Sequence, residues 1–180
     1  MIKLIRGRRG KSGKPRKIRG FTLIEMMIVL VILGVILTVA LPGFRNLTLA
    51  IRLTNYVNEF VAAVYLARGE AIKRNTNVRL CATADSTTCA TSGGWAQGWI
   101  VMDPNNVVIQ EQTALENGYS FVESGSGAHT LTFDSAGYVN AASAFKLCRQ
   151  TPSVGHQERQ VNLTLSGRAS VTRTNLGTCP

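Results

Sequence analysis

The chain has 180 residues, which suits one domain of ordinary size, and its apolar content of 45% is enough for a packed core. That content excludes a chain disordered throughout, and five prolines without a glycine period exclude a collagen-like or proline-rich fibre. A formal net charge of +10 suggests a protein that binds nucleic acid or an anionic membrane.

The excess positive charge lies almost entirely in residues 1–20, which contain nine Lys and Arg and no acid, while the remainder contains eleven basic and ten acidic residues. An apolar stretch from Phe21 to Leu41 follows, and at ~1.5 Å per helical residue it matches a bilayer core ~30 Å thick. A basic segment before an apolar one predicts membrane insertion with the positive end in the cytoplasm. We therefore expect 1–20 to be a leader and 21–41 to be a single-pass helix in inner-membrane lipid, with the rest of the chain in the periplasm.

Glu25 stands out in this apolar stretch, because a carboxylate at the centre of a membrane helix costs ~2.5–3.5 kcal/mol and needs a partner. The run Gly20-Phe21-Thr22-Leu23-Ile24-Glu25 resembles the class III signal of type IV prepilins and type II secretion pseudopilins. This resemblance implies cleavage between Gly20 and Phe21 by a prepilin peptidase and N-methylation of Phe21. It also implies that Glu25 pairs with the new α-amino group of a neighbouring subunit during filament assembly.

Residues 42–75 are expected to continue the helix as an amphipathic segment. Apolar residues recur at steps of three and four, which keeps them on one helical face: Leu53, Val57, Phe60, Val64, Ala67 and Ala71. This face should pack on a β-sheet. Glu70 and Arg74 form an i,i+4 ion pair on the helix surface. Pro42 lies where pilins commonly have a helix-bending proline, and Pro42-Gly43 predicts a bend or a melted turn.

Residues 76–180 are expected to form a β-rich head. Short segments with alternating apolar and polar residues, separated by Gly, Asn, Ser and Asp, are typical of half-buried antiparallel strands. The expected strands are Val78–Ala82, Trp99–Met102, Val107–Gln112, Tyr119–Val122, Leu131–Phe133, Phe145–Arg149, Gln160–Leu165 and Ala169–Arg173. The predicted fold is α+β and pilin-like, with a long N-terminal helix packed on an antiparallel sheet or small sandwich.

Four stretches of this region resemble the GspH/FimT group of minor pilins and pseudopilins: Ala67–Arg74, Trp95–Asp103, Leu131–Gly137 and Val161–Arg168. The resemblance implies a minor pilin that joins other major and minor pilins in a type IV pilus, near the tip, where it primes assembly, and that becomes extracellular with the pilus. A type II secretion pseudopilin of the GspH type is the alternative.

All four cysteines follow the apolar stretch, so in the periplasm they should oxidise. Four cysteines allow three pairings. We favour Cys81–Cys89, which closes a short hairpin loop, together with Cys148–Cys179, which ties the C-terminal residues to a strand. A four-thiolate zinc site is disfavoured because the sequence has no C-x₂-C pair.

No catalytic motif is present. His129 and His156 are the two histidines, and neither belongs to a recognisable motif for a nucleophile, a metal or a phosphate. We therefore expect no catalytic residue, no metal and no cofactor. A single-span anchored periplasmic enzyme is the remote alternative, and a perturbed histidine or carboxylate in a cleft would revive it.

The C-terminal part is basic, with five cations and one acid from Lys146 to Pro180, whereas Glu59 to Asp134 holds eight acids and four cations. Such a patch could contact the phosphates of double-stranded DNA. The candidate residues are Lys146, Arg149, Arg159, Arg168 and Arg173. Some FimT-like pilins of naturally competent bacteria bind DNA through a C-terminal Gly-Arg-x-Arg-x-Arg motif. Gly167-Arg168 matches its start, but Ser170 and Thr172 replace the next two arginines, and Arg173 would lie on the opposite face of a strand unless the segment turns.

Overall fold

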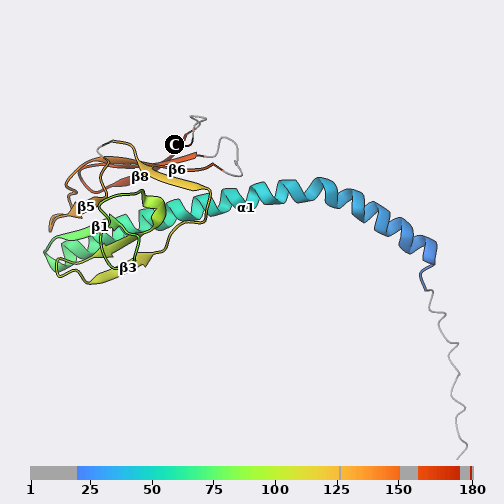
Figure 1. Ribbon diagram of the computed structural model, residues 1–180, viewed down its shortest axis with the longest axis horizontal. Helices are drawn as coiled ribbons and strands as arrows, with labels where there is room; N and C mark the ends of the chain where they lie inside the picture. The colour runs from blue at the N-terminus through green and yellow to red at the C-terminus, as the bar shows by residue number, and fades with distance from the viewer. Residues whose placement is uncertain (1–19, 126, 151–157, 175–178, 180) are drawn as a thin grey trace, which may run out of the picture. The chain divides into compact units, whose positions relative to one another are not determined.

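The computed structural model describes residues 20–125, 127–150, 158–174 and 179 (Figure 1). The chain divides into two compact units, 1–42 and 43–180. One helix, α1 (Leu23–Arg74), begins in the first unit and ends in the second without interruption. The melted turn that Pro42-Gly43 allowed is therefore absent, and the bend at Pro42 stays a prediction. Of the expected leader, all but Gly20 lies outside the described residues.

The second unit contains eight strands and one short 3₁₀ helix: β1 (Val78–Ala82), η1 (Trp95–Gln97), β2 (Trp99–Met102), β3 (Val108–Gln112), β4 (Tyr119–Glu123), β5 (Thr130–Phe133), β6 (Ser143–Arg149), β7 (Glu158–Leu163) and β8 (Ala169–Thr174). They form two four-stranded antiparallel sheets, with the orders β3-β2-β1-β5 and β4-β6-β7-β8. All eight predicted strands are present, and their ends differ from the prediction by at most two residues. The α+β fold is confirmed.

Both sheets pack on the C-terminal part of α1 (Figure 1). Each of the six residues of the predicted apolar stripe is at most 1% exposed. Phe60 lies at the centre, with ring centroids 5.4 Å from Trp95 and Trp99 and 4.8 Å from Phe121 and Phe145. Because Trp99 belongs to one sheet and Phe121 and Phe145 to the other, this helical side chain joins the two layers.

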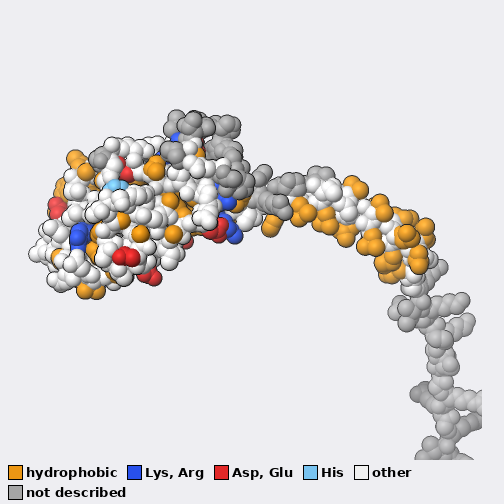
Figure 2. Space-filling view, in the orientation of Figure 1, with side chains coloured by type: hydrophobic (Ala, Val, Ile, Leu, Met, Phe, Trp, Pro, Cys, Tyr) orange, Lys and Arg blue, Asp and Glu red, His pale blue; other side chains and the backbone are white. Residues whose placement is uncertain are grey.

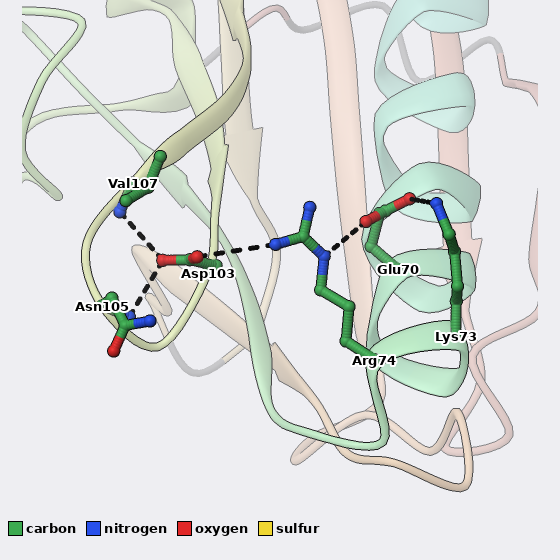
Figure 3. A network of polar contacts seen from close by, with 6 residues as sticks. All are labelled: Glu70, Lys73, Arg74, Asp103, Asn105 and Val107. Atoms are coloured by element: carbon green, nitrogen blue, oxygen red, sulfur yellow. Dashed lines mark hydrogen bonds and ion pairs between the residues drawn. The ribbon is translucent and has the colours of Figure 1, made fainter.

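A polar network fixes the end of α1 to the turn between β2 and β3 (Figure 3). Arg74 Nε donates to the Glu70 carboxylate at 2.6 Å, the predicted i,i+4 pair, and an Arg74 terminal nitrogen lies 3.5 Å from the carboxylate of Asp103. Asp103 accepts the backbone N–H of Asn105 and of Val107, both at 2.9 Å. Hydrogen bonds from Arg74 and then Lys73 lower the pKa of Glu70. The network thus links the last turn of α1 to the turn that follows β2.

The structure contains the two favoured disulfides, Cys81–Cys89 and Cys148–Cys179, with Cα atoms 5.5 and 5.7 Å apart. Inside the first loop, Asp85 accepts the backbone N–H groups of Thr87 and Thr88, at 2.9 and 2.8 Å. These two bonds, with the Thr88 hydroxyl, hold the pKa of Asp85 well below its usual range. The loop is thus closed by a covalent bond and ordered by a carboxylate.

Candidate assembly segment and nucleic-acid interface

The start of α1 is fixed by Thr22. Its hydroxyl oxygen accepts the backbone N–H of Glu25 at 3.3 Å, so Thr22 is the N-cap and Glu25 the third helical residue. A carboxylate in the first turn is also favoured by the helix dipole. Gly20 and Phe21 precede the helix. This cap was not among the features predicted from the sequence, although the run Thr-x-x-Glu is the signature of a capping box.

Many large apolar side chains between Phe21 and Leu41 are exposed within their own unit (Figure 2). Phe21 is 75% exposed. This is far more exposed apolar surface than a soluble monomer usually carries, which marks a contact surface. Among the described residues, no helix combines the length and sustained hydropathy required of a membrane span. The span expected over 21–41 therefore stays a prediction.

Lys146 does not belong to an exposed basic patch, contrary to prediction. Its side chain is buried, with 7% of the residue exposed, and its Nζ lies 3.3 Å from the carboxylate of Glu158, itself 4% exposed. A buried lysine needs such a partner. The partner comes from β7, whose register against β6 places Glu158 near Lys146. In the structure Lys146 is thus buried and paired within the head rather than part of an exposed basic surface.

Arg149 is also engaged within the head. Its guanidinium lies 4.5 Å from the ring centroid of Tyr119, which is opposite Arg149 in the β4–β6 register. This is the geometry of a cation–π interaction. Burial raises the pKa of Tyr119, and the neighbouring Arg149 opposes that rise. Arg149 is half-buried, so the structure places it in a packing role at the sheet surface.

The remaining three candidates lie on the β7–β8 hairpin. Arg168 is exposed in the connecting turn, where its carbonyl accepts the N–H of Thr164 at 3.0 Å. Arg159 on β7 and Arg173 on β8 are directly opposite each other, and Arg173 is exposed while Arg159 is half-buried. Burial, and to a smaller extent the charge of Arg173, lower the pKa of Arg159. Because β8 is a regular strand, Arg173 shares the face of Ala169, as the strand alternative predicted.

The turn that carries Arg168 packs closely against the turn after β5, a contact that was not predicted from the sequence. Gly167 has a φ of +70°, and a Cβ there would lie 2.5 Å from the carbonyl oxygen of Gly137 and 3.0 Å from Cδ of Arg68. The N–H of Val139 donates to the carbonyl of Leu165 at 2.9 Å, which joins the turns after β5 and β7. Glycine in both turns was the available signal. The turn that presents Arg168 is thereby packed against the turn after β5.

A surface pocket of about 180 Å³ lies beside η1 and includes His129, Glu123 and Trp95. Glu123 already accepts the N–H groups of Gly127 and Ala128, at 2.7 and 3.3 Å. None of the described residues that line this pocket is a serine, threonine, cysteine or lysine that could act as a nucleophile. Among the described residues, no cluster of His, Cys, Asp and Glu could hold a metal. His156 lies outside the described residues.

Two family models match the chain. The model of the type II transport protein GspH matches residues 56–167, which is more than half of the chain, and that of the prokaryotic N-terminal methylation motif matches residues 15–41. A fimbrial protein of Neisseria meningitidis serogroup A is 37% identical over 73 residues, 37% of this chain and 43% of the relative. A fimbrial protein of Pseudomonas aeruginosa is 36% identical over 69 residues, 38% of this chain and 44% of the relative. The chain thus spans less than half the length of these relatives.

Solved structures share the fold. The minor pilin FimU of Pseudomonas aeruginosa superposes with a TM-score of 0.53 at 18% identity, over 67% of this chain and 87% of that one. The minor pseudopilin EpsH from the type II secretion system of Vibrio cholerae gives 0.50 at 13% identity, over 70% and 96%. By their names these proteins are a minor pilin and a minor pseudopilin. The GspH match over 56–167 covers strands β1 to β7 of this chain. The chain belongs to the GspH family of minor pilins and pseudopilins.

Proposed function

We propose that the protein is a minor pilin that is processed after Gly20 and incorporated into a type IV pilus. The observation that carries the proposal is the joining of a methylation motif over 15–41 to a GspH head over 56–167 in one chain. In this proposal 21–41 anchors the precursor in the inner membrane, with the head in the periplasm. Prepilin peptidase cuts between Gly20 and Phe21, and Phe21 is then N-methylated.

Assembly then depends on Glu25. Cleavage creates an α-amino group on Phe21, and a carboxylate in an apolar environment is stabilised by a positive partner. The exposed apolar side chains around Glu25 provide that environment once neighbouring helices pack on them. Glu25 of one subunit would neutralise the amine of the next, which couples the entry of a subunit into the filament to prior cleavage.

The test compares Glu25→Ala with Glu59→Ala in cells, because Glu59 is an exposed glutamate of the same helix outside the motif. Sheared filaments are separated from membranes, and the subunit is quantified in each fraction. We expect Glu25→Ala to remain in the membrane fraction with both disulfides formed, and Glu59→Ala to enter filaments normally. Normal filament entry by Glu25→Ala would contradict the proposed role.

Low-abundance subunits of this kind would act near the tip, where they prime assembly with the other pilins. A type II secretion pseudopilin is the second candidate, favoured by the match to the GspH model. Deletion of the gene distinguishes the two. Loss of surface pili with normal protein secretion supports the pilus, and the reverse result supports the secretion system.

DNA binding through the β7–β8 hairpin is a further element of this proposal. Exposed Arg168 and Arg173, with half-buried Arg159 beside them, support it, because guanidinium groups form charge-assisted bonds with phosphates. The test measures the affinity of the full chain in detergent for a labelled DNA duplex by fluorescence anisotropy, at several salt concentrations. Arg168→Gln should weaken binding about fivefold or more and reduce the salt slope by about one. The matched control is Arg52→Gln, an exposed arginine paired with Glu116. Binding that is insensitive to salt, or equal in both variants, would overturn the assignment.

A further inference from the structure

Strand β8 is an edge of its sheet, and its backbone pairing shows which groups face outward. The N–H of Thr164 donates to the carbonyl of Arg168, which marks these two residues as a hydrogen-bonded pair. Such pairs recur at every second residue in an antiparallel ladder. The pairs Asn162–Ser170 and Gln160–Thr172 are therefore hydrogen-bonded as well, whereas Ala169, Val171 and Arg173 direct their N–H and C=O groups away from β7.

One outward group already has a partner. The hydroxyl of Tyr65 on α1 donates to the carbonyl of Ala169 at 2.9 Å, which confirms the direction of these groups and blocks one end of the edge. Among the described residues, no backbone partner faces Val171 or Arg173 from outside the sheet. Val171 is 44% exposed although it shares the face of buried Ala169. The edge is thus accessible along Val171 and Arg173.

The side chains on this edge carry an unbalanced charge. Four residues, one from each strand of the sheet, lie opposite one another in a cross-strand row: Phe121, Leu147, Arg159 and Arg173. The first two are buried. Like charges directly opposite each other destabilise a sheet. Among the described residues, neither arginine has an acidic partner, although an acid within the row would relieve the repulsion. The next position in the row is the one that a strand added beside β8 would occupy.

We propose that β8 pairs with an extended, acidic segment of a neighbouring protein subunit. The backbone of that segment would bond the N–H and C=O groups of Val171 and Arg173, and an Asp or Glu opposite Arg173 would complete the charged row. This is recognition by strand addition, in which the main chain supplies affinity and alternate side chains supply specificity. It goes beyond the proposed function, since it requires neither DNA nor the N-terminal segment. Alternatively, Arg173 prevents any strand from pairing at this edge. The experiment below distinguishes recruitment of an acidic strand from prevention of pairing.

The probe is a synthetic ten-residue peptide that alternates Glu with Val and Thr, added to the full chain in detergent. Hydrogen exchange of the Val171 and Arg173 amides is followed residue by residue. We expect the Glu peptide to slow exchange at both amides about tenfold or more. A peptide with Lys in place of Glu is the control, and it should give little protection because it adds a third positive charge to the row.

Two variants separate backbone pairing from charge. Val171→Pro removes one outward N–H without breaking a bond to β7, so it should abolish protection of the Arg173 amide, whereas Val171→Ala should retain it. Arg173→Glu should reverse the preference in favour of the Lys peptide, which keeps the test valid if the proline variant fails to fold. Absence of protection by the Glu peptide at millimolar concentration, or equal protection by both peptides, would overturn the proposal. Duplex DNA that protects the same amides better than the Glu peptide would also overturn it, and would leave the filament-entry result for Glu25 unaffected.

Discussion

Replacement of Phe60 by alanine should weaken the packing of both sheets on α1, because this ring contacts aromatic side chains of both sheets. Phe60 is fully buried and has four aromatic neighbours, three of them edge-on, at interplanar angles of 81°, 89° and 88°. Truncation of a buried Phe to Ala costs about 3–5 kcal/mol, and edge-to-face pairs add about 0.5–1.5 kcal/mol each beyond area burial. We therefore expect the substitution to lower the free energy of unfolding by about 4–5 kcal/mol. The total free energy of unfolding of a typical domain is about 5–15 kcal/mol.

The assay is urea unfolding of the full chain in detergent, followed by tryptophan fluorescence, because Trp95 and Trp99 contact the substituted ring. Phe60→Leu is the matched control, since it retains most of the apolar volume but loses the ring geometry, and it should cost about 1–2 kcal/mol. A loss below about 2 kcal/mol for Phe60→Ala, or equal losses for both variants, would refute the central role of the aromatic contacts.

Three further outcomes are expected. Lys146→Met should destabilise the head by about 3–5 kcal/mol, measured by urea unfolding, because it leaves the Glu158 charge buried without this partner; it should leave DNA affinity unchanged. Gly167→Ala should lower the melting temperature, because its Cβ would collide with the carbonyl of Gly137 at 2.5 Å; an unchanged melting temperature would contradict the close approach. The pKa of Asp85 is lowered in the folded chain, so its contribution is complete above the unfolded value of about 3.9 and is lost as the pH falls below it. Unfolding free energies of Asp85→Asn should accordingly depend less on pH in that range than those of the unmodified chain.

Much of the fold could be predicted because its signals are local. The stripe from Leu53 to Ala71 repeats at helical spacing, and each strand alternates between apolar and polar residues or is bounded by turn residues. The division into two sheets is not local. β5 returns to pair with β1, more than forty residues earlier in the chain, and no periodicity encodes that choice. The sequence therefore predicted the elements but left a sheet and a sandwich as equal descriptions.

The exposure of the C-terminal basic residues, in contrast, could not be predicted from the sequence. Net charge along the sequence grouped Lys146 with Arg168, but the ladder between β6 and β7 brings Glu158 to Lys146 and buries both. Arg149 is likewise placed by its opposite neighbour Tyr119. Counting charges treats every basic side chain as solvent-exposed, whereas the cross-strand register determines which of them are buried against a partner. For Arg173 the sequence left two alternatives, a strand or a turn, and β8 is a strand, which places Arg173 on the face that strand alternation gives.

The cap at Thr22 has a consequence for the order of events at the N-terminus. The peptide bond after Gly20 lies outside the helix, so cleavage there would not require any helical turn to unwind. The start of the helix would then define which peptide bond is cleaved. The amine released on Phe21 would face the positive end of its own helix, which disfavours its charge there. In a newly cleaved subunit the charged amine of Phe21 would therefore interact unfavourably with its own helix dipole. Pairing with the carboxylate of Glu25 in another subunit would offset this cost, so cleavage would favour entry into the filament.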